Sequence, residues 1–392
     1  MYARPFGIFI QAGTGKISNW ISFHYFWEHL TLMAILLATV ITSFVIGFLT
    51  IPVIIKYSMQ KNLVDIPGRR KIHKKVTPSM GGIAIFLGFF IASLVWIEIL
   101  SWKDIKFIMA SLFVIFFIGL RDDLVPLRAI IKLMGQILVA IMIILLLDLR
   151  LKSFYGLFGI EELPILVSYV ITLLTIIVIT NSFNLIDGLD GLAGSIAIIA
   201  LVAYGVWFYL VDDTVYSILS FSMAGAILAF LIFNWEPSEI FMGDTGALVI
   251  GMMLSILTIH FIEFNHNLPE SSPYRFTGSI ATAACFIIIP LVDTCRIVIL
   301  RLYKRQSPFA PDKSHVHHAI MRLGMSHAQT TIILASIQLG FIGLAILLSD
   351  IGDAYLISGI VGLSVVFSLF LDRLILRRLA SKESDENVFS GH

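Results

Sequence analysis

Apolar runs of about 20 residues recur along nearly the whole chain, and this pattern constrains the fold more than any other feature. Each run is long enough to cross the hydrocarbon core of a bilayer as a helix. The composition agrees, because 58% of the 392 residues are hydrophobic and only 14% are charged. A backbone that crosses lipid must satisfy its own hydrogen bonds, which helices do. The sequence therefore predicts an all-α, polytopic integral membrane protein.

Hydropathy and length predict about eleven membrane-spanning helices. We expect them at residues 31–56, 82–100, 105–121, 129–148, 163–182, 191–211, 214–234, 245–263, 277–302, 329–349 and 354–376. These helices form a single transmembrane domain over residues 31–378. An extracytoplasmic segment, 1–30, precedes it without the pattern of a cleaved signal peptide. A polar tail, 379–392, follows it and is expected to be disordered in the cytoplasm.

Lysine and arginine gather in every second connection between the expected helices, which predicts the orientation in the membrane. The connection after the first helix alone holds Lys61, Arg69, Arg70, Lys71, Lys74 and Lys75. The alternate connections, such as Asp212-Asp213, are short and poor in basic residues. The N-terminus is thus expected outside, with the C-terminus and the basic connections in the cytoplasm. A formal net charge of +1 gives no indication of nucleic-acid binding.

The third cytoplasmic connection, residues 181–194, carries two amides, two carboxylates and several glycines between two apolar runs. If the segment is helical, Asn184, Asp187, Gly188 and Gly191 lie along one face. Their amide and carboxylate oxygens suit a hard cation or sugar hydroxyls. A polar turn that caps two helices would also account for these residue types.

Further carboxylates lie at the cytoplasmic ends of other helices. Asp122 and Asp123 follow an apolar run, and adjacent carboxylates in such a place usually bind a metal, share a proton or meet a cation. A structural ion pair with Arg121 or Arg128 is the alternative. Asp244 precedes another run, where it could serve as an N-cap. Gathered at one membrane face, however, five carboxylates would repel one another without a cation, and Mg²⁺ is the expected ion. The five are Asp122, Asp123, Asp187, Asp190 and Asp244.

Basic and histidine residues complete the set. The first connection places cations next to glycines at a helix start, which suits a phosphate but also a purely topological loop. Lys132 lies just inside the fourth helix, where it can snorkel or reach an anionic substrate. The fifth connection ends in His315, His317 and His318. Zinc is the weaker interpretation, because no cysteine lies nearby. Imidazoles that hydrogen-bond a diphosphate or relay a proton fit the acidic surroundings better.

Five motifs occur in a recognisable order. They are Asp65-x-Pro-x-x-Arg-Lys-x-His73, Gly119-x-x-Asp122-Asp123, Asn181-x-x-Asn184-x-x-Asp187-Gly-Leu-Asp-Gly191, Phe241-Met-Gly-Asp-Thr-Gly246 and His315-x-His-His318. From residue 31 to the last helix, the chain resembles the polyprenyl-phosphate N-acetylhexosamine-1-phosphate transferases. The last motif resembles the WecA-like branch. Val316 interrupts the three consecutive histidines of the phospho-MurNAc-pentapeptide translocase branch, which is the runner-up. Ala247 stands where many relatives have serine.

The resemblance implies an enzyme of the bacterial inner membrane with its active site in the cytoplasmic loops. It would transfer GlcNAc-1-phosphate, or a related N-acetylhexosamine-1-phosphate, from a UDP-sugar to undecaprenyl phosphate and release UMP. This reaction begins the synthesis of a cell-envelope polysaccharide. It would depend on Mg²⁺, with Mn²⁺ as a substitute, and the family is compatible with a homodimer. A cation-coupled secondary transporter is the rival class, but the carboxylates lie at helix ends rather than at the membrane midplane.

The resemblance also implies roles for individual residues. Asp244 and Asn184 would bind the metal, and Asp122, supported by Asp123, would deprotonate or orient the lipid phosphate. Phosphate oxygens would be held by Lys132, His315, His317 and His318. The nucleotide side would be contacted by Lys74, Asp187 and Asp190, and Asn181 and Phe241 would also bind substrate.

Overall fold

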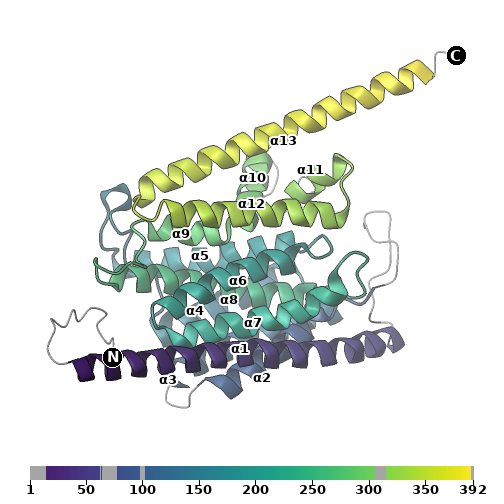
Figure 1. The fold of residues 1–392 in the computed structure, drawn as a ribbon. Coiled ribbons are helices and arrows are strands. Elements are labelled where there is room, and N and C mark those ends of the chain that lie inside the picture. The colour runs from purple at the N-terminus through teal and green to yellow at the C-terminus, as the bar shows by residue number, and fades with distance from the viewer. Residues whose placement is uncertain are drawn as a thin grey trace.

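The computed structural model describes residues 15–61, 63, 77–97, 102–303, 305 and 315–389. Within these residues the chain is helical apart from its connections, and an isolated β-bridge joins Ser153 and Glu162. The helices, labelled in Figure 1, are α1 Gly15–Gln60, α2 Gly81–Trp96, α3 Trp102–Leu124, α4 Ala129–Leu147, η2 Leu157–Gly159, α5 Ile165–Ile186, α6 Leu192–Leu210, α7 Thr214–Asn234, α8 Gly243–Asn267, α9 Ser279–Phe286, α10 Ile288–Tyr303, α11 Val316–Arg322, α12 His327–Leu347 and α13 Asp353–Phe389.

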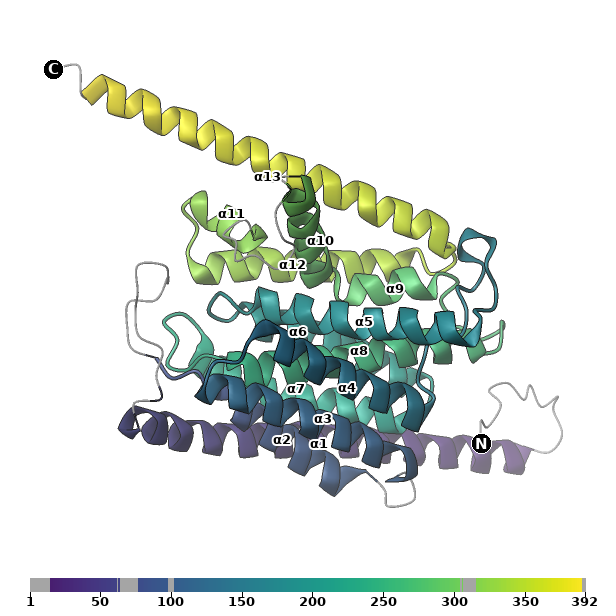
Figure 2. The same cartoon turned by 180° about the vertical axis from the view of Figure 1, so that it is seen from behind.

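Helix α8 lies in the interior of the bundle. It packs against α2, α3 and α5, and 83% of the residues in its apolar 18-residue stretch are buried. A helix that is apolar on all sides is expected in such a position. The outer helices instead expose large apolar side chains, such as Leu37 of α1, Leu145 of α4 and Val366 of α13. Figures 1 and 2 show α1 along one border of the bundle and α13 along the opposite border. Apolar side chains on the outer surface are typical of a protein surrounded by lipid.

Eight helices among the described residues are long and apolar enough to cross a membrane, and a bent pair, α9 and α10, adds a ninth. The predicted all-α, multi-pass architecture is confirmed, whereas the count of eleven is not. Two expected spans account for the difference. Helix α2 has only 16 residues, and α3 carries charged residues near both of its ends.

The span expected at 277–302 is not one straight helix, because α9 and α10 meet at an angle of 90°. A bend frees backbone groups that must find other partners inside a membrane. The buried side chain of Gln338 in α12 supplies them. Its Nε2 donates to the carbonyl of Phe286 at 2.7 Å, and its Oε1 accepts from the amide of Ile289 at 3.4 Å. As a result α10 runs across α12 and contacts α5 (Figure 2).

Both terminal helices are longer than the sequence pattern indicates. Helix α1 begins at Gly15, within the segment 1–30 that was expected to precede the membrane domain. Helix α13 continues to Phe389, through most of the tail 379–392. The tail contains no glycine or proline before Phe389, the residue types that most disfavour a helix.

The sequence motifs that lie within the described residues come together at one end of the bundle, where α3 and α5 end and where α2, α8, α11 and α12 begin. We call this side of the bundle the motif end. Backbone hydrogen bonds connect its loops. The amide of Gly82 donates to the carbonyl of Met242 at 2.8 Å, and the amide of Phe241 donates to the carbonyl of Pro78 at 2.8 Å. The motif end is therefore a connected structure rather than a set of separate loops.

Candidate active site

The N-terminus of α8 is capped by a carboxylate from another helix. Asp123, at the end of α3, accepts hydrogen bonds from the amides of Asp244 at 2.8 Å and Thr245 at 3.0 Å, and from the Thr245 hydroxyl. The residue at the N-cap position itself, Met242, makes no side-chain capping bond. The capping role considered for Asp244 therefore belongs to Asp123. This leaves the carboxylate of Asp244 available for other partners.

Two glycines permit this close approach. A Cβ on Gly119, one turn before Asp123, would lie 2.6 Å from the Thr245 Cα, so a larger residue would push α3 away from α8. Gly243 adopts a φ of +72°, and a Cβ there would lie 2.2 Å from the carbonyl oxygen of Ser79. Glycine is the residue that adopts such a backbone without strain. The glycines of both motifs thus bring Asp123 within reach of the α8 amides.

Lys132 of α4 joins two of the predicted site carboxylates. Its Nζ lies 3.1 Å from Oδ1 of Asp244 and forms a closer ion pair with Oδ2 of Asp122. The other oxygen of Asp122 accepts from the amide of Leu127 at 2.5 Å. The Asp122 side chain is only 5% exposed, so an unpaired charge there would be costly. The ammonium group therefore holds α3, α4 and α8 together at one point.

The ion pairs considered for Asp122 and Asp123 at the sequence level are not the ones formed. Arg121 directs its guanidinium to the carbonyl of Val125 at 2.8 Å, and the cation paired with Asp122 is Lys132. Sequence proximity favours Arg121, but successive side chains of a helix point in different directions. Lys132 reaches Asp122 because α3 and α4 pack against each other after a short connection.

Asn184 and Asp187 approach the same place from α5. This helix ends at the motif end while α8 begins there, and the two helices touch where a Cβ on Gly251 would lie 2.9 Å from the Thr180 Cα. Asp187 follows Thr180 by seven residues, and Asp244 precedes Gly251 by seven. The antiparallel packing of α5 and α8 therefore brings Asp187 towards Asp244, about two turns nearer the motif end. Asn184 lies between these levels, and its side chain makes no hydrogen bond to the described part of the chain.

The electrostatics of Asp187 agree with this register. Burial, together with the neighbouring carboxylates of Asp244, Asp123 and Asp190, raises the pKa of Asp187 to about 8. Asp187 thus retains a proton for want of a positive partner. Asn184, Asp187 and Asp244 thus present oxygen atoms at the same end of the bundle, and of these only Asp244 is described with a cationic partner, Lys132. These residues fit Mg²⁺, which prefers oxygen ligands.

Asp190 is held by groups of the protein. Its Oδ1 accepts from the hydroxyl of Ser238 at 3.0 Å, and its Oδ2 lies 3.3 Å from Nδ1 of His327. Burial alone would raise the pKa of Asp190, but the bonds with His327 and Ser238 lower it below its usual value. The hydroxyl of Thr331 also donates to the Asp190 carbonyl at 3.2 Å. This network attaches the start of α12 to the connection between α5 and α6.

Asn181 forms a contact between two helices. Its Nδ2 donates to Oε1 of Gln136 at 2.6 Å, and the Gln136 Nε2 donates back to Oδ1 of Asn181 at 3.3 Å. Gln136 is buried, so this reciprocal amide pair satisfies polar groups between α4 and α5 that would otherwise have no hydrogen-bond partner. The substrate contact predicted for Asn181 stays a prediction.

The histidine motif reaches the connection that carries Asp187. A Cβ on Gly188 would lie 3.2 Å from Nε2 of His317. The His317 ring stacks on that of His315, with centroids 5.3 Å apart, and lies 4.4 Å from that of His318. Burial, reinforced by His318, lowers the pKa of His317 to about 3, so this imidazole is neutral near pH 7. Its Nδ1 has no hydrogen-bond partner in the described part of the chain.

The zinc alternative can be compared with this geometry. Donor atoms of Asp293, His315 and His317 lie within 4.8 Å of one another. Both carboxylate oxygens of Asp293 are already engaged, however, one with Nδ1 of His315 and one with the amide of Val316. Asp293 is thus held by hydrogen bonds within the protein, whereas Nδ1 of His317 has no partner in the described part of the chain.

The structure brings most predicted site residues to one place. Lys74 lies outside the described residues, and Phe241 is half-buried in the loop before α8. The residues that the sequence-based prediction missed are Gln136, Ser238, Asp293 and His327. None of these four stood out, because each acts through another side chain at a distant position. Polar residues within or beside apolar runs were the available signal.

Comparisons with known proteins show the family of this chain. The model of glycosyl transferase family 4 matches residues 105–262, which include all five predicted site carboxylates. The "Probable undecaprenyl-phosphate N-acetylglucosaminyl 1-phosphate transferase" of Bacillus subtilis (strain 168) is 32% identical over 308 residues, which are 77% of this chain and 82% of that protein. The "Undecaprenyl-phosphate alpha-N-acetylglucosaminyl 1-phosphate transferases" of Yersinia pestis and Escherichia coli (strain K12) are each 31% identical, covering 74% of this chain and 78% and 77% of the relatives. The chain therefore belongs to glycosyl transferase family 4, among the polyprenyl-phosphate N-acetylhexosamine-1-phosphate transferases that its motifs resemble.

Proposed function

We propose that this protein transfers GlcNAc-1-phosphate from UDP-GlcNAc to undecaprenyl phosphate, giving undecaprenyl-diphospho-GlcNAc and UMP. The observation that carries the proposal is the junction of Asp122, Lys132 and Asp244 at the end of an apolar helix bundle, in a chain whose relatives bear this activity in their names. Such a junction lies where a phosphate on a lipid can meet a phosphate on a water-soluble nucleotide. The product would begin a cell-envelope polysaccharide in a bacterial membrane.

The reaction we propose is a direct displacement. An oxygen of the lipid phosphate forms a bond to the phosphorus attached to the sugar, while the bond from that phosphorus to the bridging oxygen of UMP breaks. Asp122 orients the lipid phosphate, or takes its proton when the phosphate is protonated. For this the carboxylate of Asp122 must be released from Lys132. A bound phosphate provides the exchange, because it offers the ammonium group other anionic oxygens.

We propose Mg²⁺ as the cofactor, held by Asp244 and Asn184 with Asp187 close by. When bound, the ion would neutralise charge on the diphosphate and on the departing UMP. Asp123 keeps Asp244 in place through the first amides of α8. Lys132 and the three histidines of the motif would bind phosphate oxygens, and Lys74, Asp187, Asp190 and Phe241 would contact the nucleotide.

We also propose that the motif end faces the cytoplasm, where UDP-sugars are available. The Lys- and Arg-rich connections are on this side of the predicted topology. The same orientation would put the connection around Asp212 and Asp213 outside. A cysteine introduced at Asp212, in a variant without Cys285 and Cys295, should react with an impermeant thiol reagent added to whole cells.

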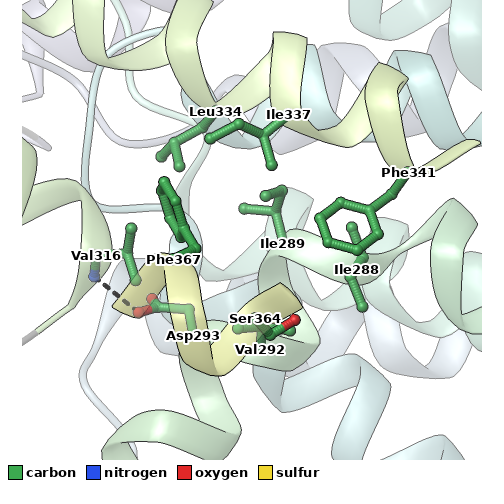
Figure 3. Close-up of a pocket in the computed structure, with 10 residues that line it drawn as sticks. All are labelled: Ile288, Ile289, Val292, Asp293, Val316, Leu334, Ile337, Phe341, Ser364 and Phe367. Atoms are coloured by element: carbon green, nitrogen blue, oxygen red, sulfur yellow. Dashed lines mark hydrogen bonds between the residues drawn. The ribbon is translucent and has the colours of Figure 1, made fainter. Parts of the chain in front are cut away.

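One observation favours a GlcNAc donor over the pentapeptide donor. The side chain of Val316, between His315 and His317, lines a small apolar cavity with Phe367 and Leu334 (Figure 3). A histidine at this position, a fourth imidazole beside His315, His317 and His318, would have to be buried in a mostly apolar cavity. The packing of α11 thus accommodates valine at position 316, which supports the WecA-like reading of the motif.

Transfer assays with purified protein test the proposal. The protein in detergent would receive undecaprenyl phosphate, Mg²⁺ and one labelled donor: UDP-GlcNAc, UDP-GalNAc or UDP-MurNAc-pentapeptide. We expect UMP release and label in the lipid phase with UDP-GlcNAc, and loss of both on addition of EDTA. Transfer from the pentapeptide donor alone would overturn the choice of sugar but not the chemistry. Substrate-dependent ion uptake into proteoliposomes, without any transfer, would instead favour a transporter.

A further inference from the structure

Asp293 is a buried carboxylate to which the proposed reaction assigns no role. It lies in α10, just beyond the 90° bend, and is 3% exposed. Figure 3 shows it at the edge of a cavity of about 30 Å³ whose other lining residues are apolar apart from Ser364. An ionised group in such surroundings is costly unless both of its oxygens are hydrogen-bonded.

Both oxygens of Asp293 are satisfied by the start of the histidine motif. Oδ1 accepts from the amide of Val316 at 2.8 Å, and Oδ2 lies 2.8 Å from Nδ1 of His315. Val316 is the first residue of α11, and His315 at the N-cap position makes no capping bond with its own side chain. Asp293 therefore caps α11 from another helix and contacts the His315 ring at the same time.

The second contact determines where His315 carries its proton. An ionised carboxylate only accepts hydrogen bonds, so Nδ1 of His315 must be the donor. The other ring nitrogen, Nε2, is then left to accept a hydrogen bond or a proton, or to donate when the ring is charged. A histidine that acts on a phosphate or on its proton needs this nitrogen in a defined direction.

The ring of His315 is also the support of the neighbouring histidine. It stacks on His317 with an interplanar angle of 14°, and Nε2 of His317 faces Gly188 beside Asp187. A rotation of the His315 ring would thus disturb the contact between the histidine motif and the acidic residues.

We propose that Asp293 is a positioning residue that holds His315 as the Nδ1–H tautomer and orients the histidine motif towards the phosphates. This inference rests on the proposed role of the histidines in phosphate binding. It predicts that the carboxylate of Asp293 matters through its effect on His315, beyond its capping of α11.

The decisive variant is Asp293→Asn, which has nearly the same shape. Its amide oxygen can still accept from Val316, but its NH₂ group cannot accept from Nδ1 of His315. By analogy with the partners of metal-ligating histidines, whose removal costs about 10- to 100-fold, we expect kcat to fall by that range while KM for UDP-GlcNAc stays the same. Selective ¹⁵N-histidine labelling should show one imidazole changing from the Nδ1–H to the Nε2–H form. A His315→Gln variant identifies that signal among the ten histidines.

Two controls separate positioning from packing. Val316→Pro removes the amide that Asp293 caps, at a helix position where proline is tolerated. His315 has φ −57° and ψ 148°, a conformation compatible with a following proline. Ser364→Ala changes the other polar side chain of the cavity, whose hydroxyl donates to the carbonyl of Ile360. Val316→Pro should lower the stability, because it leaves one oxygen of buried Asp293 without its donor, but both variants should keep most of the wild-type kcat and the wild-type tautomer.

A double-mutant cycle completes the test. If Asp293 acts through His315, Asp293→Asn should add no further loss to His315→Gln. Full additivity, or unchanged kcat and tautomer in Asp293→Asn, would overturn the proposal. Should Asp293→Asn fail to fold, Asp293→Glu keeps the carboxylate and should retain the tautomer; an Nε2–H signal in that variant would equally count against the proposal. The ¹⁵N spectra do not depend on turnover, so they separate this inference from a failure of the proposed function.

Discussion

Asp123 and Asp293 occupy equivalent situations in two halves of the motif end. Each comes from a neighbouring helix and accepts from the first amides of a helix that carries functional residues, α8 for Asp123 and α11 for Asp293. They differ in the remaining partner. Asp123 binds the hydroxyl of Thr245, whereas Asp293 binds the imidazole of His315.

This difference separates two ways of supporting a site. A hydroxyl and two backbone amides do not titrate, so Asp123 fixes the geometry around Asp244 without changing the chemical state of its own partners. An imidazole has two tautomers and a charged form, so Asp293 also determines the chemical state of its partner. We therefore expect the acidic half of the site to respond to mutation mainly through geometry, and the histidine half through protonation.

The largest effect should come from the residue that Asp123 supports. Asp244→Ala removes a proposed metal ligand and one partner of Lys132, and we expect kcat to fall by about 10³-fold or more. Binding of Mn²⁺, followed by electron paramagnetic resonance, should be lost as well. Asp350→Ala, at the opposite end of the bundle, is the control. Retained turnover in Asp244→Ala would refute its proposed role.

Asp123→Asn tests the supporting carboxylate of the acidic half, for comparison with Asp293→Asn in the histidine half. The amide can accept from one α8 amide but no longer serves both amides and the hydroxyl. We expect a loss of about 0.5–2 kcal/mol of stability, the cost of an impaired helix cap, and weaker Mn²⁺ binding. Thr245→Val removes only the hydroxyl and should have a smaller effect on the melting temperature. If Asp123→Asn left stability intact and changed only kcat, the two carboxylates would not differ as described.

The pH dependence of stability should report Asp187. Its pKa of about 8 in the folded protein exceeds the ordinary value of 3.8, so the folded state binds more protons than the unfolded state between these values. The free energy of unfolding should therefore fall as pH rises from about 4 to 8. The measurement is the melting temperature of metal-free protein across this range. Asp187→Asn should flatten the curve, as should saturating Mg²⁺, and an unchanged slope in the variant would count against the assignment.

The smallest effect on kcat should come from a change at Gln338, which stabilises the bend between α9 and α10. Gln338→Met has a similar length but leaves the backbone groups of Phe286 and Ile289 without their partner. We expect a loss of about 1–3 kcal/mol in stability and a modest reduction of kcat, with Mn²⁺ affinity unchanged. Ser336→Ala, on the exposed side of α12, serves as the control. A changed Mn²⁺ affinity would show that the bend also supports the acidic half.

Much of the site could be predicted from residue types alone. Asp122, Asp244, Asp187 and His317 were all selected from their positions at the ends of apolar runs, and the structure brings them to the same end of the bundle. Their partners could not be predicted in the same way. The ion pair of Asp122 with Lys132 displaced the expected pairing with arginine, because helix packing rather than proximity in sequence decides which charges meet.

The sequence by itself determined the multi-pass helical architecture and the residue types at the motif end. Both are local properties. An apolar run of sufficient length must form a helix in lipid, and the chemistry of acidic, amide and histidine side chains belongs to the residues themselves. Only the tertiary structure decided which groups act together. Close contact at Gly119 brings Asp123 to the start of α8, and the 90° bend before α10 is where the chain turns towards His315. These contacts join residues distant in sequence, and they arise from the packing of whole helices, which no short stretch of sequence encodes.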